Sequence, residues 1–129
     1  MTLKQGNAPL ATSVLDPFAV PLDPWPIPAD QVRAGQPTAR GAVIARSDDR
    51  RTLTGIWECT PGTFDWSYSW DETITVLAGR VTIADEGGAT RGFKAGDVVR
   101  FPVGLRATWT VHETVRKMFA LISPTPVEL

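Results

Sequence analysis

Hydrophobic and polar residues alternate with a period of two along most of the chain after residue 40, which is the pattern of half-buried β-strands. The runs are short, rich in β-branched and aromatic residues, and separated by turn signals such as "SDDR", "DEGGA" and "PVGL". The expected strands cover residues 41–46, 53–60, 64–69, 73–79, 80–85, 91–96, 97–102, 107–113 and 115–122. No stretch keeps a helical period over three turns, so the pattern predicts an all-β sandwich or barrel.

The alternation also assigns faces to the expected strands on either side of the "AGR" turn signal. Ile74, Val76, Val81 and Ile83 are predicted to point into the core. Thr73, Thr75, Arg80 and Thr82 are predicted to face solvent.

The first 39 residues follow a different pattern, because seven of the 11 prolines lie there. The stretch "PFAVPLDPWPIPAD" excludes a helix and a central strand, since proline lacks the backbone donor that both require. Phe18, Trp25 and Ile27 are apolar residues of a kind that disordered tails usually lack. A disordered leader remains the alternative, but the composition favours an extended arm that packs on this domain or on a partner subunit.

These patterns divide the chain into an extended proline-rich N-terminal arm, residues 1–39, and a β-barrel domain, residues 40–129. An open barrel leaves strand edges that a second copy can cover. We therefore expect a homodimer in which the arm contacts the partner subunit.

Composition narrows the location and the partners of this single domain of 129 residues. A net charge of −1 gives no basic surface for nucleic acid. No run of about 18 apolar residues exists to span a bilayer, and the N-terminus lacks the apolar core of a secretory signal. Cys59 is the single cysteine, so an internal disulfide is impossible. We expect a cytoplasmic protein with no nucleic-acid or membrane partner.

The stretch "WSYSWDETITVLAG" carries the most unusual side-chain pattern. Trp66, Tyr68 and Trp70 share one parity, and Glu72 continues it. On a strand that parity is one face, where a plain core would carry Val, Ile or Leu and a metal site would carry His.

Two glycine-spaced segments resemble the two motifs of the RmlC-like cupin superfamily. Six residues separate Glu72 from Gly79 in "ETITVLAG"; five separate Gly96 from Pro102, and Gly104 follows, in "GDVVRFPVG". Gly79 and Gly96 are interpreted as hairpin turns, and Pro102 with Gly104 as the bend into the next strand. The wider phrase, with "GLRATW" and "VRK", resembles the third cupin family, the small single-domain cupins related to ureidoglycine aminohydrolase. The resemblance covers roughly residues 40 to 122 and implies a cupin-type jelly-roll β-barrel.

The chain departs from the metal-binding cupins at three ligand positions. The two histidines of the first motif fall on Trp66 and Tyr68, and the histidine of the second falls on Ala107. Only Glu72 keeps a ligand type, whereas a catalytic divalent site usually needs three or more protein ligands. The single histidine, His112, lies in "TVHETV", an expected turn, and cannot rebuild the set. We expect no metal site and no cofactor.

The same positions are candidates for a ligand pocket, because rings with a few polar groups are typical of small-molecule sites. Val115, Lys117, Phe119 and Leu121 share one parity, so Lys117 is expected to point inside and pair with Glu72. The candidate ligand-binding residues are Trp66, Tyr68, Trp70, Glu72, Trp109 and Lys117. The alternatives are that the rings merely fill the barrel and that Lys117 extends to its rim.

Three classes of function stay open. The first is a cupin that binds a small polar or anionic molecule in an aromatic-lined cavity. The second is a cupin enzyme, an aminohydrolase or an epimerase or isomerase, in which Glu72 is the base or the sole remaining metal ligand, Tyr68 the acid or an orienting donor, and Lys117 a third catalytic candidate. The third is a structural or interaction module whose aromatic residues are core. Since one fold carries many activities, the resemblance does not decide between them.

Overall fold

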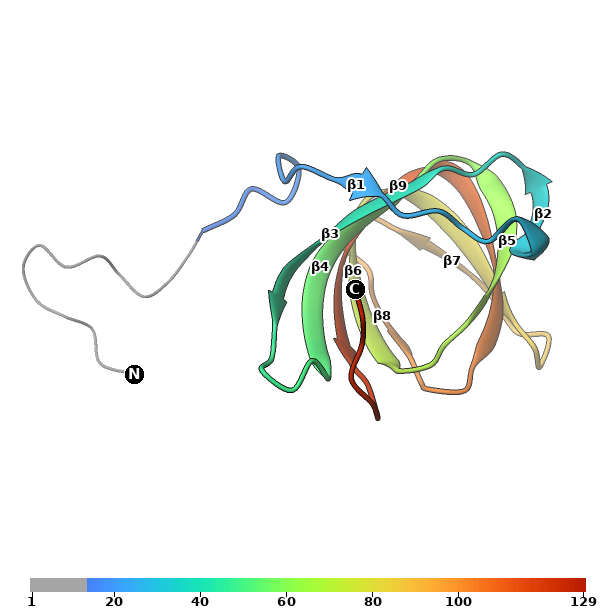
Figure 1. The fold of residues 1–129 in the computed structure, drawn as a ribbon. Helices are drawn as coiled ribbons and strands as arrows, with labels where there is room; N and C mark the ends of the chain where they lie inside the picture. The colour runs from blue at the N-terminus through green and yellow to red at the C-terminus, as the bar shows by residue number, and fades with distance from the viewer. Residues whose placement is uncertain (1–13) are drawn as a thin grey trace, which may run out of the picture.

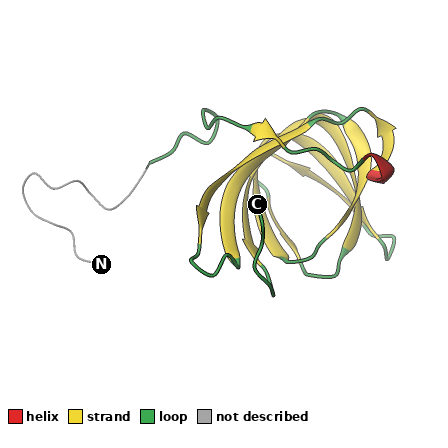
Figure 2. Cartoon of the chain, in the orientation of Figure 1, coloured by secondary structure: helices red, strands yellow, loops and turns green. Residues whose placement is uncertain are grey.

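The computed structural model describes residues 14–129, so the first part of the expected arm lies outside the described residues. Within them the chain forms nine strands and one short 3-10 turn, arranged as a barrel (Figures 1 and 2). The elements are β1 (Asp23–Pro24), η1 (Ala29–Gln31), β2 (Val32–Gly35), β3 (Ala39–Arg46), β4 (Thr52–Cys59), β5 (Gly62–Ser67), β6 (Asp71–Asp85), β7 (Thr90–Lys94), β8 (Val98–Phe101) and β9 (Arg106–Ile122). The predicted all-β jelly-roll barrel is confirmed.

Two long antiparallel strands, β6 and β9, run through both halves of the barrel and pair with each other along their length. In one half β9 pairs with β4 and β6 pairs with β8. In the other half β9 pairs with β5 and β6 pairs with β7. The shorter strands β3 and β1 extend the first half beyond β4, and β2 extends the second half beyond β5.

The predicted turn at Gly79 is wrong, because residues 71–85 form one continuous strand. The register between β6 and β9 shifts at three places between Val76 and Val81, as at a β-bulge. Between the pairs Val76–Lys117 and Val81–Val111, β6 advances by five residues and β9 by six, and the odd number on β6 explains why its buried positions change from Ile74 and Val76 to Val81 and Ile83. Gly79 has a φ of 86°, and its missing side chain leaves room for the β9 backbone at Thr114.

The predicted turn at His112 is also wrong. Residues 106–122 form a single strand, and the exposed His112 lies inside it with Nε2 2.7 Å from Thr82 Oγ1. The pairing partner of β9 changes there, from β5 up to Val111 to β4 from Val115. The polar residues 112–114 therefore mark the place where β9 passes from one half of the barrel to the other.

The remaining turn residues of the second motif connect the two halves. Gly96 has a φ of 94° in a β-turn where Asp97 N donates to Lys94 O, but β7 and β8 do not pair, so the expected hairpin is absent. β8 ends at Phe101, and Leu105 N donates to Pro102 O, as expected of a bend into the next strand. These turns place β8 and β9 on opposite sides of β6.

The described part of the N-terminal segment packs on its own barrel. β1 pairs with β3 and β2 pairs with β5, and both lie at the edges of the sheet, where proline is tolerated. The Arg116 guanidinium donates to the carbonyl oxygens of Pro17 and Val20. The homodimer stays a prediction, since a single chain is described.

Side chains follow the predicted alternation and fill the barrel. Val115, Lys117, Phe119 and Leu121 are buried, as are the four residues of β6 whose parity predicts an inward face. No helix among residues 14–129 is long and apolar enough to cross a bilayer.

Candidate functional site

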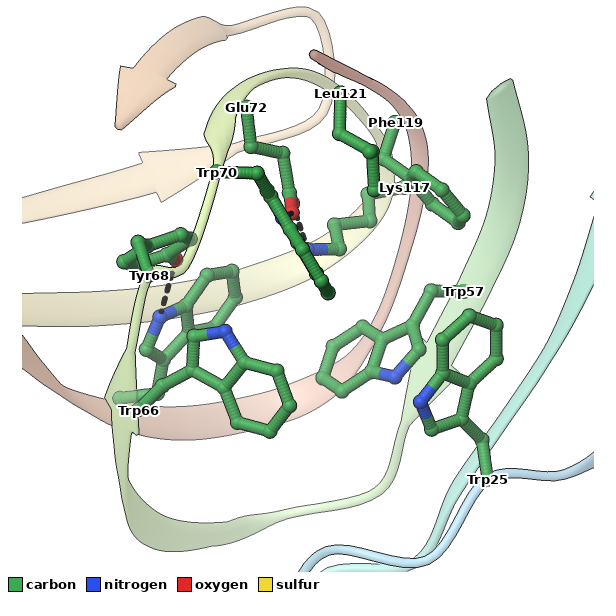
Figure 3. Close-up of a pocket in the computed structure, with 10 residues that line it drawn as sticks. Trp25, Trp57, Trp66, Tyr68, Trp70, Glu72, Lys117, Phe119 and Leu121 are labelled. Atoms are coloured by element: carbon green, nitrogen blue, oxygen red, sulfur yellow. Dashed lines mark hydrogen bonds and ion pairs between the residues drawn. The ribbon is translucent and has the colours of Figure 1, made fainter. Parts of the chain in front are cut away.

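One pocket inside the barrel gathers all five tryptophans of the chain and its single tyrosine (Figure 3). Its lining residues are Trp25, Trp57, Trp66, Tyr68, Trp70, Glu72, Trp109, Lys117, Phe119 and Leu121. The six residues that the sequence predicts as ligand-binding are all among them. Their roles stay predictions.

Several elements bring these side chains together. Trp66 lies near the end of β5, Glu72 near the start of β6, and Tyr68 and Trp70 on the connection between the two strands. β9 contributes Trp109, Lys117, Phe119 and Leu121, all on its inward face. The shared parity of residues 66 to 72 therefore leads to one pocket although it crosses a strand boundary.

Glu72 and Lys117 form an ion pair in the pocket. Lys117 Nζ donates to Glu72 Oε2 at 2.8 Å, and Trp70 Nε1 donates to Glu72 Oε1 at 2.8 Å. Glu72 is 5% exposed and Lys117 is 7% exposed. Both carboxylate oxygens are thus hydrogen-bonded, as a buried carboxylate requires. The predicted pairing is present, and Lys117 does not extend to the rim.

Aromatic faces surround the Lys117 ammonium group. Its Nζ lies 4.8 Å from the centre of the Trp57 ring and 5.0 Å from that of Trp109, within the range of cation–π attraction. Trp109 stacks with Phe64 at 6.1 Å and meets Trp57 edge-on at 5.8 Å. These contacts hold the cation in one place, and its one hydrogen bond within residues 14–129 goes to Glu72.

Tyr68 adds a hydroxyl group to the charged pair in the pocket. It is 3% exposed, its ring stacks on Phe101 at 4.7 Å, and its hydroxyl oxygen accepts a hydrogen bond from Trp109 Nε1 at 3.2 Å. Burial, followed by the nearby negative charge of Glu72, raises the pKa of Tyr68 well above its usual value. The phenol therefore stays neutral at physiological pH and keeps its O–H as a donor.

The enclosed space is small. The cavity has a volume of about 40 Å³, whereas sites for drug-sized ligands span roughly 300–1,000 Å³. Trp25, Trp57, Trp66 and Trp70 line the pocket and are only half-buried. The cavity itself has room for one small functional group.

The residues in this pocket do not fit a metal ion. The Glu72 carboxylate, its only anionic ligand type, is already bonded through both oxygens, and a lysine ammonium lies where a cation would have to bind. Among residues 14–129 no group of three or more His, Cys, Asp or Glu side chains could hold a metal.

Sequence reasoning missed four lining residues: Trp25, Trp57, Phe119 and Leu121. Parity alone places Phe119 and Leu121 on the inward face, but only as core. Trp57 has the same parity as the buried Leu53 and Cys59, which is a usable signal. Trp25 has none, because irregular proline-rich backbone has no period that would assign its side chain to a face.

Cys59 ends β4 and is not among the residues that line this pocket. It is fully buried, and burial raises its pKa to about 12. In the unfolded chain a thiol ionises near pH 8.5, so the unfolded state loses a proton that the folded state keeps. We therefore expect stability to fall as pH rises from about 8.5 to 10. Thermal melting at several pH values measures this fall, which should be smaller in Cys59→Ala. Equal pH dependence of the two proteins would contradict it.

Comparison with known proteins agrees with the barrel and its motifs. A model of the EutQ-like cupin domain family matches residues 46–119, more than half of the chain. No curated protein matches.

Three solved structures illustrate the similarity. A DUF861-family protein from Thermotoga maritima is 43% identical over 52% of this chain and 76% of its own, with a TM-score of 0.51. A protein of unknown function from Pseudomonas syringae, also of the DUF861 family, is 25% identical, with 91% of this chain and 51% of its own aligned at a TM-score of 0.76. The EutQ protein of Clostridium difficile, at 18% identity, shares the fold over 85% of this chain and 86% of its own, with a TM-score of 0.67.

Proposed function

The chain belongs to the EutQ-like cupin domain family, and on that premise we propose that its barrel binds a small molecule carrying a carbonyl or carboxylate oxygen. The oxygen of this molecule enters the cavity beside Lys117 and Tyr68, and the apolar part of the molecule lies between the half-buried tryptophan rings that line the pocket. The observation that carries this proposal is the surplus of hydrogen-bond donors at the base of an aromatic pocket.

The donor surplus follows from the hydrogen bonds of the described residues. Lys117 has three N–H donors and uses one, on Glu72. Tyr68 accepts from Trp109, and its own O–H has no acceptor within residues 14–129. Both oxygens of Glu72 are occupied. A ligand that accepts hydrogen bonds therefore complements the pocket, whereas an amine would meet the Lys117 cation.

The size of the cavity and the charge of its side chains limit the class of ligand further. The cavity of about 40 Å³ takes a single carbonyl or carboxylate group. The neutral Glu72–Lys117 pair gives no net positive charge to attract an anion, so an uncharged amide should bind at least as well as a carboxylate. We expect small amides or short carboxylic acids.

Three molecules of one size test the proposal: propionamide, propionate and propylamine. A ligand that binds only the folded state adds about 2.7 kcal/mol of stability at a hundred times its dissociation constant. We expect propionamide, and propionate more weakly, to raise Tm in thermal melting, and propylamine to leave it unchanged. Tyr68→Phe keeps the ring and loses the donor, so its response to propionamide should fall. A rise with propylamine alone would contradict the proposed chemistry.

We also propose that this chain is a metal-free branch of the family, in which Trp66, Tyr68 and Ala107 replace three ligand histidines. The ion pair supports this, since Lys117 neutralises the one remaining carboxylate. Elemental analysis of the purified protein should find no stoichiometric transition metal. About one zinc, manganese, iron or nickel per chain, lost in Glu72→Gln, would contradict it.

An enzymatic role is the second candidate, and one observation favours it: a carboxylate and an un-ionised phenol line the same pocket. Glu72 would accept a proton, and Tyr68 would donate one or orient the substrate. The reaction would be that of an aminohydrolase, as in the ureidoglycine aminohydrolase-like cupins that the chain resembles, or that of an epimerase or isomerase. Turnover of ureido compounds or of small sugars that is lost in both Glu72→Gln and Tyr68→Phe would favour this role over binding.

We also propose that the protein is a homodimer with a cytoplasmic location.

A further inference from the structure

One wall of the aromatic pocket comes from the N-terminal segment. Trp25 lines the pocket and packs edge-on against Phe119, with ring centres 6.0 Å apart (Figure 3). Its ring lies over Gly41 of β3, where an added Cβ would come within 2.9 Å of the Trp25 Cζ3 atom. The missing side chain of Gly41 leaves the space that the Trp25 ring occupies, and we call Gly41 the seat of this wall.

Few contacts hold the segment that carries Trp25. Its backbone joins the barrel through the two-residue strand β1 and the bond from Trp25 N to Ala39 O. Further toward the N-terminus, Arg116 Nε donates to Pro17 O at 2.9 Å and Arg116 Nη2 to Val20 O at 3.3 Å. Arg116 itself is held on β9 near Glu58, whose carboxylate also pairs with Arg40 at 2.6 Å.

Burial along the segment is low compared with the barrel. None of residues 14–38 is fully buried, and Val14, Leu15 and Phe18 are each at least half exposed. Segments with few buried apolar contacts open at a lower free energy than the core they pack on. The pocket therefore combines walls from the buried strands β4, β6 and β9 with one wall that is held by fewer buried contacts.

We propose that residues 14–26 form a docked wall of the pocket, with Arg116 as its anchor and Gly41 as its seat, and that docking controls access to the aromatic cavity. This inference rests on the proposed function for its purpose, because a wall matters only where a ligand enters. Arg116 acts through the segment and is a positioning residue.

Docking and binding are then linked quantitatively. If only the docked form completes the site, the apparent affinity falls in proportion to the docked fraction. A ligand that contacts Trp25 should favour docking to the same degree. Loss of the anchor should weaken binding without altering any group that faces the cavity.

Tryptophan fluorescence tests the inference without a ligand, because the other four tryptophans all line this pocket. The native chain is the background, because Trp25→Phe would alter the wall whose docking is tested. Acrylamide, a small neutral quencher, is added to the native protein, to Arg116→Gln and to Arg40→Gln. We expect Arg116→Gln to raise the quenching constant, because the undocked fraction, in which acrylamide reaches the tryptophans of the cavity, increases.

The Arg40 variant is the matched control, since it also removes an arginine from Glu58 but touches no carbonyl of the segment. Its quenching should equal that of the background. Equal quenching in all three proteins, or an equal rise in both arginine variants, would overturn the inference. Far-UV circular dichroism checks that each variant keeps its strands.

A second pair of variants acts through the seat instead of the anchor. Gly41→Ala places a methyl group where the Trp25 ring lies, whereas Gly92→Ala in β7 meets no atom closer than 4.0 Å. In the otherwise native chain, Gly41→Ala should shift the emission to longer wavelength and increase quenching, and Gly92→Ala should do neither. Unchanged emission in Gly41→Ala would overturn the inference. If Arg116→Gln and Gly41→Ala increase quenching but propionamide does not raise the Tm of the native protein, the movable wall is supported and only the proposed ligand is refuted.

Discussion

Replacing Glu72 with glutamine is expected to destabilise the protein by about 3–5 kcal/mol, the usual cost of leaving a buried partner charge unpaired. Lys117 is 7% exposed, and its one hydrogen bond within the described residues goes to Glu72. Trp70 and Lys117 bond different oxygens of Glu72, so a glutamine would turn its NH2 group toward one of these two donors. Thermal melting should show a fall in Tm of more than about 10 °C.

A double variant separates the lost charge from the altered shape. Glu72→Gln/Lys117→Met leaves no buried charge, and the glutamine oxygen can still accept from Trp70 Nε1. Since a buried ion pair can often be replaced by uncharged residues at little cost, the double variant should be more stable than either single variant. Glu128→Gln is the surface control: Glu128 pairs with Arg50 at 2.9 Å, but both side chains are at least half exposed. It should change stability by about 0–1 kcal/mol.

The size of the stability change would also show whether the Glu72–Lys117 ion pair is buried or exposed. A cost below about 1 kcal/mol for Glu72→Gln is the value of an exposed pair and would contradict a buried site. A large cost that the second substitution does not recover would mean that the loss does not come from an unpaired Lys117 charge, since the glutamine oxygen can still accept from Trp70. Only the expected pattern is consistent with a cation held inside the aromatic pocket.

The sequence predicted the barrel and the inner face of the site because burial leaves a strict period of two. Alternation placed Lys117 inside, and the cost of burying a carboxylate identified Glu72 as its partner. The same logic did not reach Trp25, which lies in backbone without a period and meets the barrel only after folding. The segment's contacts with β3 and Phe119 are tertiary, and no local pattern encodes them.

The strand boundaries failed for a different reason. A glycine between two alternating runs fits a turn, and it equally fits a bulge inside one strand. At Gly79 the choice is made by β9, which pairs with β6 on both sides of the glycine. Polar residues 112–114 likewise resemble a turn in isolation, and they form part of a strand because β6 lies beside them. Local sequence therefore places the irregularity correctly but leaves its type to the partner strand.

The bulge at Gly79 leads to the second large expected effect. Gly79→Ala should destabilise the protein by about 2–5 kcal/mol, which combines roughly 1–2 kcal/mol for a left-handed L-residue with about 1–3 kcal/mol for overpacking. The new Cβ would lie 2.7 Å from the carbonyl carbon of Thr114 and 2.8 Å from the oxygen of Glu113, both backbone atoms of β9. Since β6 and β9 carry the two halves of the barrel, a shift there also moves Lys117 relative to Glu72.

Gly88→Ala is the matched control for Gly79→Ala, because Gly88 has a φ of 91° but no atom within 4 Å of the position that a Cβ would take. Its substitution tests the cost of the backbone conformation alone, about 1–2 kcal/mol. Urea denaturation of the two variants should give a larger loss for Gly79→Ala, and its excess over Gly88→Ala measures the contact with β9. Equal losses would show that β9 can move away from the bulge freely. In that case the two halves of the barrel would not be rigidly joined, and the geometry of the Glu72–Lys117 pair would have to be maintained by the aromatic rings alone.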